Sequence, residues 1–239
     1  MNPSISLVIL CLNEELTLKP TYNHYKSQLL KLSIDHEIII VNDGSTDQTE
    51  QVAEGLRDGD KNIILLSNDQ RKGMGYGYKK GLKIASKEYY MFAGGGSAPS
   101  EEDIKQLINS VQKNDLVLAY VKNPQIRRPV RQILSKCFTF LMSAITGLKL
   151  KYFNAMVIAR VSHLKRVNVR SDGHTFSAEF AIKLIKHHNC TYCEVPVTIG
   201  SVKTKPKNSF NLAFNLIQSA KFIMILFYDI HLAKPENNS

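Results

Sequence analysis

The stretch from Val41 to Asp47, Val-Asn-Asp-Gly-Ser-Thr-Asp, carries the residue types best suited to chemistry in this sequence. An apolar, β-branched run places Asp43 at its end, Gly44 permits a sharp turn, and Ser45 can cap the helix that follows. A strand-to-helix turn explains Gly44 and Ser45 without any ligand, but it does not require Asp43. A carboxylate at the carboxyl end of a parallel strand can accept hydrogen bonds from a base N–H or a ribose hydroxyl. The stretch therefore predicts a nucleoside-binding turn.

Strands and helices that alternate along the chain must position this turn. Apolar runs predict strands over residues 6–12, 37–41, 62–67 and 89–93, and helical patterns cover residues 17–32, 46–57, 75–85 and 101–112. This alternation predicts an α/β fold with an open, mostly parallel sheet flanked by helices. Ligands bind such sheets beyond the carboxyl ends of the strands. Asn13-Glu14, Asn42-Asp43 and residues 94–97 each follow a strand, so we expect them to converge on one cleft.

The same kind of pattern continues in the second part of the chain. It predicts strands at 115–121, 154–159 and 191–197, a basic and apolar segment at 127–148, a helix at 176–188, a basic loop at 202–208 and a strongly apolar helix at 209–230. Neither an internal repeat nor a linker divides the 239 residues. We therefore predict one domain with a C-terminal extension.

The positive charge lies in the second part of the chain. Residues 1–100 hold 11 Lys and Arg against 12 Asp and Glu, whereas residues 101–239 hold 20 against 9. The net charge of +10 is therefore divided into −1 and +11. Such an excess indicates a solvated surface or a face that meets nucleic acid, lipid headgroups or a phosphate-bearing substrate, and charge alone does not choose among these.

Composition excludes several classes of protein. With 44% apolar residues and four scattered cysteines, the chain is neither disordered nor a disulfide scaffold. Its apolar runs are shorter than the ~18 residues that a membrane-spanning helix needs, and no basic region precedes the apolar start at Ile5. We therefore expect a cytoplasmic protein without a transmembrane span or signal peptide.

Two motifs suggest a cofactor at first sight, but in each the spacing of the residues argues against that cofactor. Cys190 and Cys193, with His187 and His188 nearby, suggest zinc, but residues three apart on an extended chain point to opposite faces. The glycines that begin at Gly73 do not have the spacing of a dinucleotide-binding loop, so we do not expect NAD.

The order of the motifs resembles that of family 2 glycosyltransferases. The resemblance is carried by residues 6–15, residues 39–47, and Asn68 and Gly73 followed by Gly81-Leu82-Lys83-Ile84-Ala85, and it extends to about residue 215. It implies a GT-A (Rossmann-like) domain over residues 1–208, with a nucleotide-binding half at 1–100 and an acceptor half at 101–208, followed by an apolar or amphipathic C-terminal helix and tail at 209–239. The implied reaction is inverting transfer of a sugar from a UDP- or GDP-linked donor.

Later residues resemble one branch of that family. Glu194-Val195-Pro196-Val197, followed by the basic loop and Ser209-Phe210, is similar to the enzymes that transfer sugars to polyprenyl or dolichyl phosphate. The implied partners are therefore a nucleotide sugar and a polyprenyl phosphate or anionic membrane surface, with peripheral membrane association and no nucleic acid. The C-terminal helix suits a membrane interface, a second copy of the chain, another partner or the protein's own sheet.

The resemblance implies a set of site residues. In the family, the residues matching Glu14 and Asp43 contact the nucleoside, and the segment matching Arg71 to Gly75 lies near the donor phosphates. The nucleotide-binding set is Leu12, Asn13, Glu14, Asp43, Gly44, Arg71, Gly73, Gly95, Gly96 and Ser97. The basic residues expected to meet the acceptor or its phosphate are Arg127, Arg128, Arg131, Lys203, Lys205 and Lys207.

The acidic metal-binding element of the family is missing. Relatives usually carry Asp-x-Asp after the fourth strand, where it holds Mg²⁺ or Mn²⁺, but this chain has Gly94-Gly95-Gly96-Ser97. No carboxylate stands at Gly96, the expected metal position, so the metal is absent, held by backbone carbonyls or held by residues from elsewhere. Ser100 and Asp103 predict a helix cap. The glycines could instead let backbone N–H groups approach a phosphate.

Glu179 is the candidate catalytic residue. It stands where the family often has an acidic residue facing the acceptor, and a hydroxyl acceptor would need such a general base. A phosphate acceptor needs none, in which case Glu179 would only orient groups or be an exposed helix carboxylate. Three alternatives to an active lipid-phosphate transferase stay open: a nucleotide-binding module without a metal site, a transferase to a soluble glycan or protein, and a nucleic-acid binder.

Overall fold

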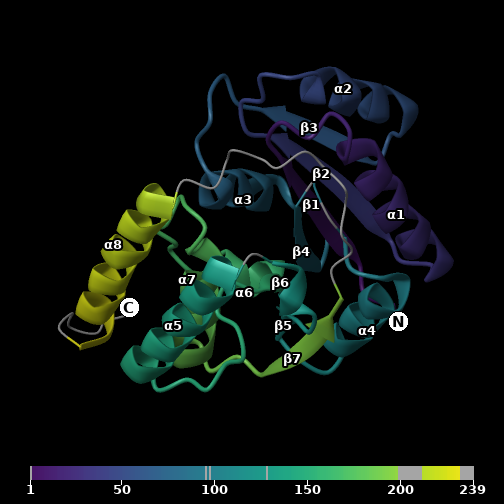
Figure 1. Cartoon of the computed structure of the whole chain (residues 1–239). Helices are drawn as coiled ribbons and strands as arrows, with labels where there is room; N and C mark the ends of the chain where they lie inside the picture. Colours follow the sequence, from purple (N-terminus) through teal and green to yellow (C-terminus); the bar gives the residue numbers. More distant parts are fainter. Residues whose placement is uncertain (1, 95, 97, 128, 199–211, 232–239) are drawn as a thin grey trace.

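Seven strands form one mixed sheet in the computed structural model of the protein, in the order β3-β2-β1-β4-β6-β5-β7 (Figure 1). Its strands are β1 (Ile5–Cys11), β2 (His36–Asn42), β3 (Ile63–Ser67), β4 (Tyr89–Gly94), β5 (Leu116–Val121), β6 (Met156–Arg160) and β7 (Tyr192–Val197). Strand β6 runs antiparallel to β4 and β5, while the other pairs are parallel. The predicted mostly parallel α/β sheet is thus confirmed. The structure describes residues 2–94, 96, 98–127, 129–198 and 212–231, and within the last range the side chains of residues 219–228.

Helices cover both faces of the sheet because each strand buries alternate side chains on opposite sides. Ile38 and Ile40 of β2 belong to the core cluster that includes residues of α1, α2 and α4, whereas Ile39 and Val41 belong to the cluster that includes residues of α3, α5, α7 and α8. These helices are α1 (Leu18–Lys31), α2 (Thr49–Gly59), α3 (Met74–Ile84), α4 (Glu101–Val111), α5 (Pro129–Thr146), α7 (Phe176–His187) and α8 (Leu212–His231). The result is a three-layer arrangement with an apolar core on each side of the sheet.

The strand register brings the predicted site turns to one edge of the sheet. Cys11 pairs with Asn42, Leu10 with Gly94, and Asn42 with Ser67, so four neighbouring parallel strands end at nearly the same level. The turns that follow β1, β2, β3 and β4 therefore leave the sheet side by side.

One predicted boundary was wrong and two short elements were missed, in each case for a local reason. The helix expected from Thr46 begins at Thr49, because Asp47 accepts a hydrogen bond from the Thr49 N–H and holds a turn there (3.0 Å). Two short elements were not predicted, namely the 3₁₀ helix η1 (Pro124–Ile126) and helix α6 (Val161–Leu164). Each of these elements is too short to show a periodic pattern of hydrophobic residues in the sequence.

The predicted Ser100 cap at the start of α4 is present, since the Asp103 N–H donates a hydrogen bond to the Ser100 hydroxyl (3.2 Å).

The last helix packs on α5 through one of its sides. Phe222 and Leu226 of α8 are buried, and the Phe222 ring stacks on Phe138 with 6.5 Å between centroids. Met224 and Tyr228 are on the other side and are exposed. Within the described residues, no helix has the length and apolar character needed to cross a membrane.

Candidate active site

The turns after β1 and β2 are tied together by their polar side chains. The Asn13 side-chain oxygen accepts a hydrogen bond from the Thr46 N–H (2.8 Å), and the Asn13 N–H donates to the Ser45 hydroxyl (3.0 Å). The Glu14 N–H donates to the Thr49 hydroxyl (2.7 Å). Because these bonds cross from one turn to the other, Asn13 and Glu14 are fixed in position relative to the Asp43 turn.

Asp43 is buried at the end of β2 and organises the turn after β3. Its side chain is 2% exposed and accepts hydrogen bonds from the Asn68 amide group (3.0 Å), the Lys72 N–H (2.8 Å) and the Gly73 N–H (2.9 Å). An ionised carboxylate has about four acceptor positions, so about one remains for a ligand. Asp43 thus fixes the backbone of residues 68–73, the segment predicted to lie near the donor phosphates.

Glycine is required beside this carboxylate. Gly44 has a φ of +72°, and a Cβ atom built there would lie 2.4 Å from the backbone carbon of Gln70. Neither the backbone conformation nor the space is available to another residue. The close approach of residues 44 and 70 brings the β2 and β3 turns together around Asp43.

The 71–75 segment also packs against a loop from the second half of the chain. The Gly75 N–H donates to the Asp172 carbonyl oxygen (2.8 Å), and the Lys79 ammonium group pairs with the Asp172 carboxylate (2.6 Å). Gly73 has a φ of +107°, and a Cβ there would lie 2.4 Å from the same carbonyl oxygen. The predicted nucleotide-binding and acceptor halves therefore meet at Asp172.

Glu179 of α7 binds the backbone of the loop at residues 170–173, which contains Asp172. It is 2% exposed, so the alternative that it is an exposed helix carboxylate is wrong. It accepts hydrogen bonds from the Arg170 N–H (3.0 Å), the Ser171 N–H (2.9 Å) and the Lys183 ammonium group (2.7 Å). Burial alone would raise the pKa of Glu179, but these hydrogen bonds to the charged form, that of Lys183 first, bring the pKa below its ordinary value. Glu179 is thus an ionised anchor for the 170–173 loop.

The turn after β4 lies beside Glu14. A Cβ atom at Gly96 would be 2.8 Å from one Glu14 carboxylate oxygen and 3.1 Å from the other, whereas Gly94 is exposed and has nothing within 4 Å. Glu14 also accepts a hydrogen bond from the Thr17 hydroxyl. Mg²⁺ and Mn²⁺ prefer several hard oxygen ligands, and Glu14 is the one carboxylate that these contacts place here. Gly94 and Gly96, the residues of this turn that the structure describes, therefore do not fit the metal implied by the Asp-x-Asp resemblance.

The basic candidates of the second half are partly described. The Arg127 guanidinium group donates to the Tyr152 hydroxyl (3.3 Å) and lies 5.6 Å from the centre of that ring. Desolvation first, and then the like charge of Arg127, lowers the pKa of Arg131. Desolvation and the charge of Arg131 also lower the pKa of His174. The charges of Arg127 and Arg131, and that of Arg131 and the His174 ring, therefore lie close enough to interact, and the Arg131 side chain is exposed to solvent.

The other predicted residues are partly outside the described structure. Leu12 is half-buried directly after β1, and Arg71 is exposed in the turn after β3. Predictions for Gly95, Ser97, Arg128, Lys203, Lys205 and Lys207 fall outside the described residues.

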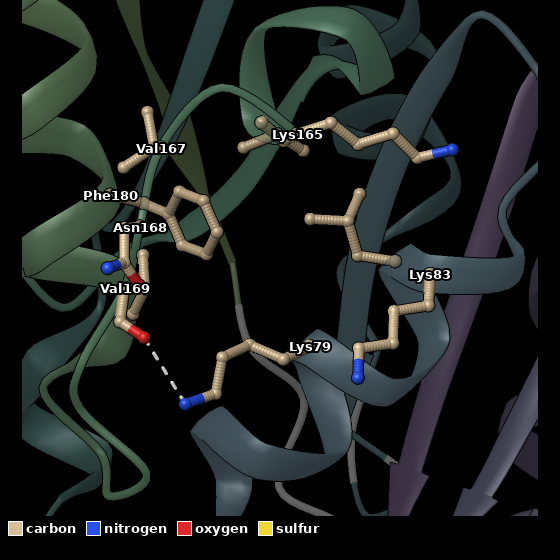
Figure 2. A pocket seen from close by; sticks show the side chains of 9 residues that line it. Lys79, Lys83, Lys165, Val167, Asn168, Val169 and Phe180 are labelled. Carbon is tan, nitrogen blue, oxygen red and sulfur yellow. Dashed lines mark hydrogen bonds between the residues drawn. The ribbon is translucent and has the colours of Figure 1, made fainter.

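A separate cavity of about 210 Å³ lies between α3 and the 164–169 segment (Figure 2). Lys79, Lys83 and Lys165 surround an apolar floor that includes Phe180. None of the predicted nucleotide-binding residues lines this cavity. It is therefore distinct from the edge of the sheet where the Asp43 turn lies.

Sequence reasoning missed two of the residues that build the candidate site. Asn68 follows β3 at the same edge as Asp43, and this position could have identified it as a partner of that carboxylate. Asp172 contacts α3 through its backbone carbonyl oxygen as well as its side chain, and a backbone contact of this kind cannot be predicted from a sequence pattern.

This arrangement of fold and turns agrees with a match to a known family. The sequence profile described as "Glycosyl transferase family 2" matches residues 6–164 of the chain. The chain therefore belongs to glycosyl transferase family 2, as the motifs predict.

Two curated relatives illustrate the range within this similarity. The dodecaprenyl-phosphate galacturonate synthase of Rhizobium johnstonii is 27% identical over 176 residues, which is 72% of this chain and 52% of that protein. The poly-beta-1,6-N-acetyl-D-glucosamine synthase of Staphylococcus epidermidis is 32% identical over 146 residues, which is 60% of this chain and 34% of that protein. The chain thus spans about half of the first relative and about a third of the second.

Solved structures share the fold at low sequence identity. The glucosyl-3-phosphoglycerate synthase of Mycobacterium tuberculosis in complex with phosphoglyceric acid superposes with a TM-score of 0.71 at 17% identity, over 95% of this chain and 79% of that chain. The same enzyme with Mg²⁺ and uridine diphosphate gives a TM-score of 0.69 at 16% identity, with the same two coverages. These similarities support the GT-A fold.

Proposed function

We propose that the protein transfers a sugar from a nucleotide-sugar donor to a phosphate-bearing acceptor, and that this acceptor is a polyprenyl phosphate. An acceptor oxygen would attack the anomeric carbon in line, while the bond from that carbon to the donor phosphate breaks and its electron pair leaves with the nucleoside diphosphate. The observation that carries this proposal is the buried Asp43 carboxylate, around which the turn at residues 68–73 is arranged. The catalytic contribution of the protein would be positioning and stabilisation of the leaving group.

The donor nucleoside would lie at the edge of the sheet formed by the first two turns. Asp43 retains about one acceptor position after its three internal hydrogen bonds, and a base or ribose group can donate to it. Glu14, fixed through the Thr49 hydroxyl, would face the same nucleoside. Arg71 would offset part of the diphosphate charge, since its exposed side chain belongs to the turn that Asp43 holds.

Glu179 would act as a positioning residue in this reaction. A phosphate acceptor is already anionic, so the attack needs no general base. The hydrogen bonds that Glu179 accepts from Arg170 and Ser171 instead fix the loop that meets Gly75. A hydroxyl acceptor would restore the need for a base, and Glu179 would then be the candidate.

The acceptor phosphate would be met by Arg127 and Arg131. Two neighbouring guanidinium groups repel each other, and an anion between them would relieve that repulsion. The Rhizobium johnstonii relative is named for a polyprenyl-phosphate product, which supports an acceptor of this kind. Lys203, Lys205 and Lys207, which the resemblance assigns to the same phosphate, lie outside the described residues.

Exposed apolar side chains support contact with a membrane surface. On α5, Val130, Ile133 and Phe140 are 56%, 62% and 77% exposed, and their spacing places them on one side of the helix. Met224 and Phe227 of α8 are likewise exposed, and α8 packs on α5. Apolar residues beside basic ones suit an interface with anionic lipid, so the acceptor could be reached without a membrane-spanning helix.

Donor binding is tested by equilibrium titration with UDP- and GDP-sugars, with and without Mn²⁺. We expect one nucleotide class to bind the unaltered chain and to bind Asp43→Asn at least ~10-fold more weakly. Asp58→Asn is the matched control, because Asp58 is an exposed carboxylate on α2. Absence of binding by every donor, or equal binding by Asp43→Asn, would reject the enzyme proposal.

The acceptor is tested with radiolabelled donor and two acceptors, a polyprenyl phosphate in vesicles and a soluble phosphoglycerate. We expect label in the lipid fraction, and we expect Arg131→Gln to reduce it more than Lys136→Gln, which changes an exposed lysine on the same helix. Label in phosphoglycerate alone would overturn the lipid acceptor while leaving the transferase function intact.

A second candidate function follows from the turn after β4. Residues 94–97, among which the resemblance implies the acidic metal-binding element, include no carboxylate, so the chain would bind nucleotide without transferring sugar. Donor binding at ordinary affinity with no product from either acceptor is the outcome that distinguishes this binding module from the transferase.

A further inference from the structure

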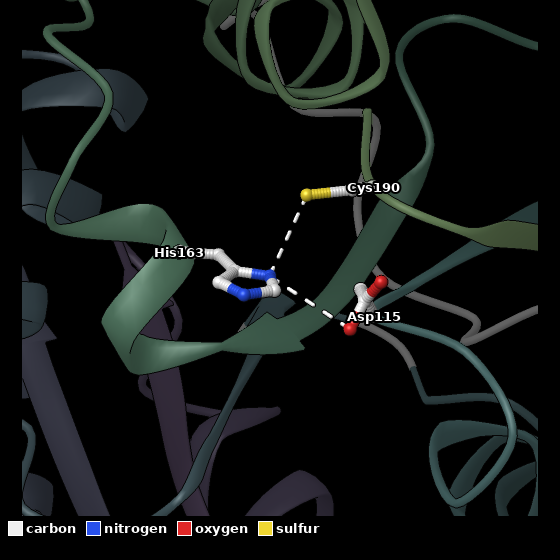
Figure 3. A group of neighbouring side chains, drawn as sticks. All are labelled: Asp115, His163 and Cys190. Atoms are coloured by element: carbon white, nitrogen blue, oxygen red, sulfur yellow. Dashed lines mark hydrogen bonds and ion pairs between the residues drawn. The ribbon is translucent and has the colours of Figure 1, made fainter. Parts of the chain in front are cut away.

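Three side chains with metal-binding atoms meet at the edge of the sheet opposite the Asp43 turn. Asp115 directly precedes β5, Cys190 lies shortly before β7, and His163 belongs to α6, which follows β6 (Figure 3). Because β6 is antiparallel to β4 and pairs Arg160 with Tyr89, the start of α6 lies at the amino end of β4. This cluster is therefore remote from the candidate donor site.

The distances within the cluster suit a tetrahedral metal ion. The Cys190 Sγ is 3.5 Å from the His163 Nδ1, and the Asp115 Oδ1 is 4.0 Å from the same nitrogen. All three ligand atoms lie within 4.8 Å of one another. Zinc bond lengths at tetrahedral angles require separations of about 3.3–3.6 Å, so the sulfur and nitrogen already match and the carboxylate needs to move closer to both.

The same geometry does not suit a nucleophilic cysteine. In a Cys-His-Asp triad the thiol and the carboxylate contact opposite nitrogens of the imidazole ring, whereas both groups face Nδ1 here. Desolvation first, and then the charge of Asp115, raises the pKa of the Cys190 thiol. A nucleophilic thiol needs a lowered pKa. A cation bound by all three side chains would explain why the thiol and the carboxylate both face the Nδ1 atom of His163.

The surroundings orient the carboxylate and balance the charge. The second oxygen of Asp115 accepts hydrogen bonds from the Thr191 N–H (3.0 Å) and hydroxyl (2.7 Å), which leaves Oδ1 on the side of His163. Arg160 lies 3.8 Å from Oδ1, but its charge is also paired with Glu88. A divalent cation with one thiolate and one carboxylate would then be close to neutral.

We propose that Asp115, His163 and Cys190 form a zinc-binding site with water as the fourth ligand. Cysteine sulfur, imidazole nitrogen and carboxylate oxygen are all zinc ligands in proteins. The ion would join the start of β5, helix α6 and the chain before β7 at the amino edge of the sheet. On binding, Cys190 would release its thiol proton to solvent.

The proposal changes the sequence-based view of Cys190 and Cys193. The Cys-x-x-Cys spacing argues against zinc because the two sulfurs point to opposite faces, and in the structure Cys193 packs against the other core cluster. The missing ligands come instead from Asp115 and His163, 75 and 27 residues away in sequence from Cys190. His187 and His188 do not belong to the cluster.

The test uses the full chain, freed of metal with a chelator and titrated with Co²⁺ and Zn²⁺. We expect one equivalent of Co²⁺ to produce a thiolate-to-cobalt charge-transfer absorption band, which one equivalent of Zn²⁺ abolishes. We expect Cys190→Ser to lack the band and to bind Zn²⁺ at least ~100-fold more weakly. Cys193→Ser is the matched control and should retain both properties.

His163→Asn provides a second variant, because His163 is only half-buried and its replacement should not prevent folding. We expect it to weaken Zn²⁺ binding as Cys190→Ser does, with an unchanged circular dichroism spectrum. The proposal is overturned if no charge-transfer band appears, if Cys193→Ser removes the band, or if Cys190→Ser and His163→Asn both bind Zn²⁺ like the unaltered chain.

Discussion

The turns after β2 and β4 lie at the same edge of the sheet but differ in how their sequences use it. The β2 turn carries a buried carboxylate, Asp43, which accepts three hydrogen bonds. The β4 turn carries glycines, and Gly96 lies against Glu14 from the turn after β1. The carboxylate of one turn forms hydrogen bonds that fix the neighbouring turn, whereas the other turn supplies a glycine that lies close against a neighbour's carboxylate.

This difference separates two possible roles of a carboxylate at this edge of the sheet, namely stabilising the turns and binding a metal. Asp43 holds the backbone of residues 68–73 even without a ligand, and it thereby organises the proposed donor site. A metal-binding carboxylate after β4 would not be needed to hold the backbone in this way, and the fold forms without one. We infer that the turns contribute differently: carboxylates around the β2 turn stabilise the fold, whereas the residue at position 96 of the β4 turn affects metal binding. Four substitutions test this contrast.

Asp43→Ala should have the largest effect. It leaves two backbone N–H groups and the Asn68 amide group without their acceptor in a buried position, at about 1–3 kcal/mol each before water enters. We expect the free energy of unfolding to fall by at least ~3 kcal/mol in urea titrations. Asp58→Ala, at an exposed position on α2, should change it by less than ~0.5 kcal/mol. A loss below ~1 kcal/mol for Asp43→Ala would mean that the 68–73 turn does not depend on this carboxylate.

Gly44→Ala should have the next largest effect. The left-handed backbone costs about 1–2 kcal/mol for a residue with a Cβ atom, and displacement of the Gln70 backbone adds to this cost. Gly55→Ala is the matched control, because Gly55 lies in the exposed interior of α2 with nothing within 4 Å of a new Cβ. We expect the control to stabilise by about 0.5–1 kcal/mol, since alanine favours helix. Equal effects of the two substitutions would show that the β2 and β3 turns can separate freely.

The parts of the fold that repeat with a clear period were predictable from the sequence. Each predicted strand of the α/β sheet is present within one or two residues, because runs such as 38–41 are apolar on both faces, as buried parallel strands are. The start of α2 was not predictable from propensity, because Asp47 bonds to the Thr49 N–H and to the turn after β1. Tertiary contacts of this kind override the local preference for a helix.

The residues of the candidate site were predictable only where they belong to a recognisable sequence motif. The position of Asp43 follows from its strand and from the resemblance, but its partners Lys72 and Gly73 contribute backbone N–H groups, which any residue type would supply. The burial of Glu179 was equally hidden, since its partners Arg170 and Ser171 also act through backbone atoms. Sequence patterns reveal side-chain chemistry but not the backbone groups that a fold brings to it.

Glu179→Gln tests whether the stability of the protein also depends on a second buried carboxylate, the one that holds the 170–173 loop against the 71–75 segment. The folded-state pKa of Glu179 is lowered from an ordinary value of 4.5, so its contribution to stability is full above that pH and is lost as the pH falls below it. We expect the variant to be less stable by about 1–2 kcal/mol at pH 7, and the difference should shrink below pH ~4.5. Glu54→Gln, at an exposed position on α2, should show no such pH dependence. A constant difference from pH 7 to pH 3 would contradict an ionised Glu179.

Gly96→Asp should have the smallest effect on stability and the most specific effect on metal binding. The new side chain would begin 2.8 Å from a Glu14 carboxylate oxygen, so Glu14 must shift and two negative charges would repel at a cost of about 1 kcal/mol or less. Mn²⁺ bound between the two carboxylates would reverse this cost, by ~1.4 kcal/mol at ten times its dissociation constant. We therefore expect Mn²⁺ to raise the melting temperature of Gly96→Asp but not that of Gly96→Asn, which has the same size without the charge. If Mn²⁺ stabilises the unaltered chain equally, its ligands come from outside the β4 turn, and the contrast between the two turns no longer concerns metal binding.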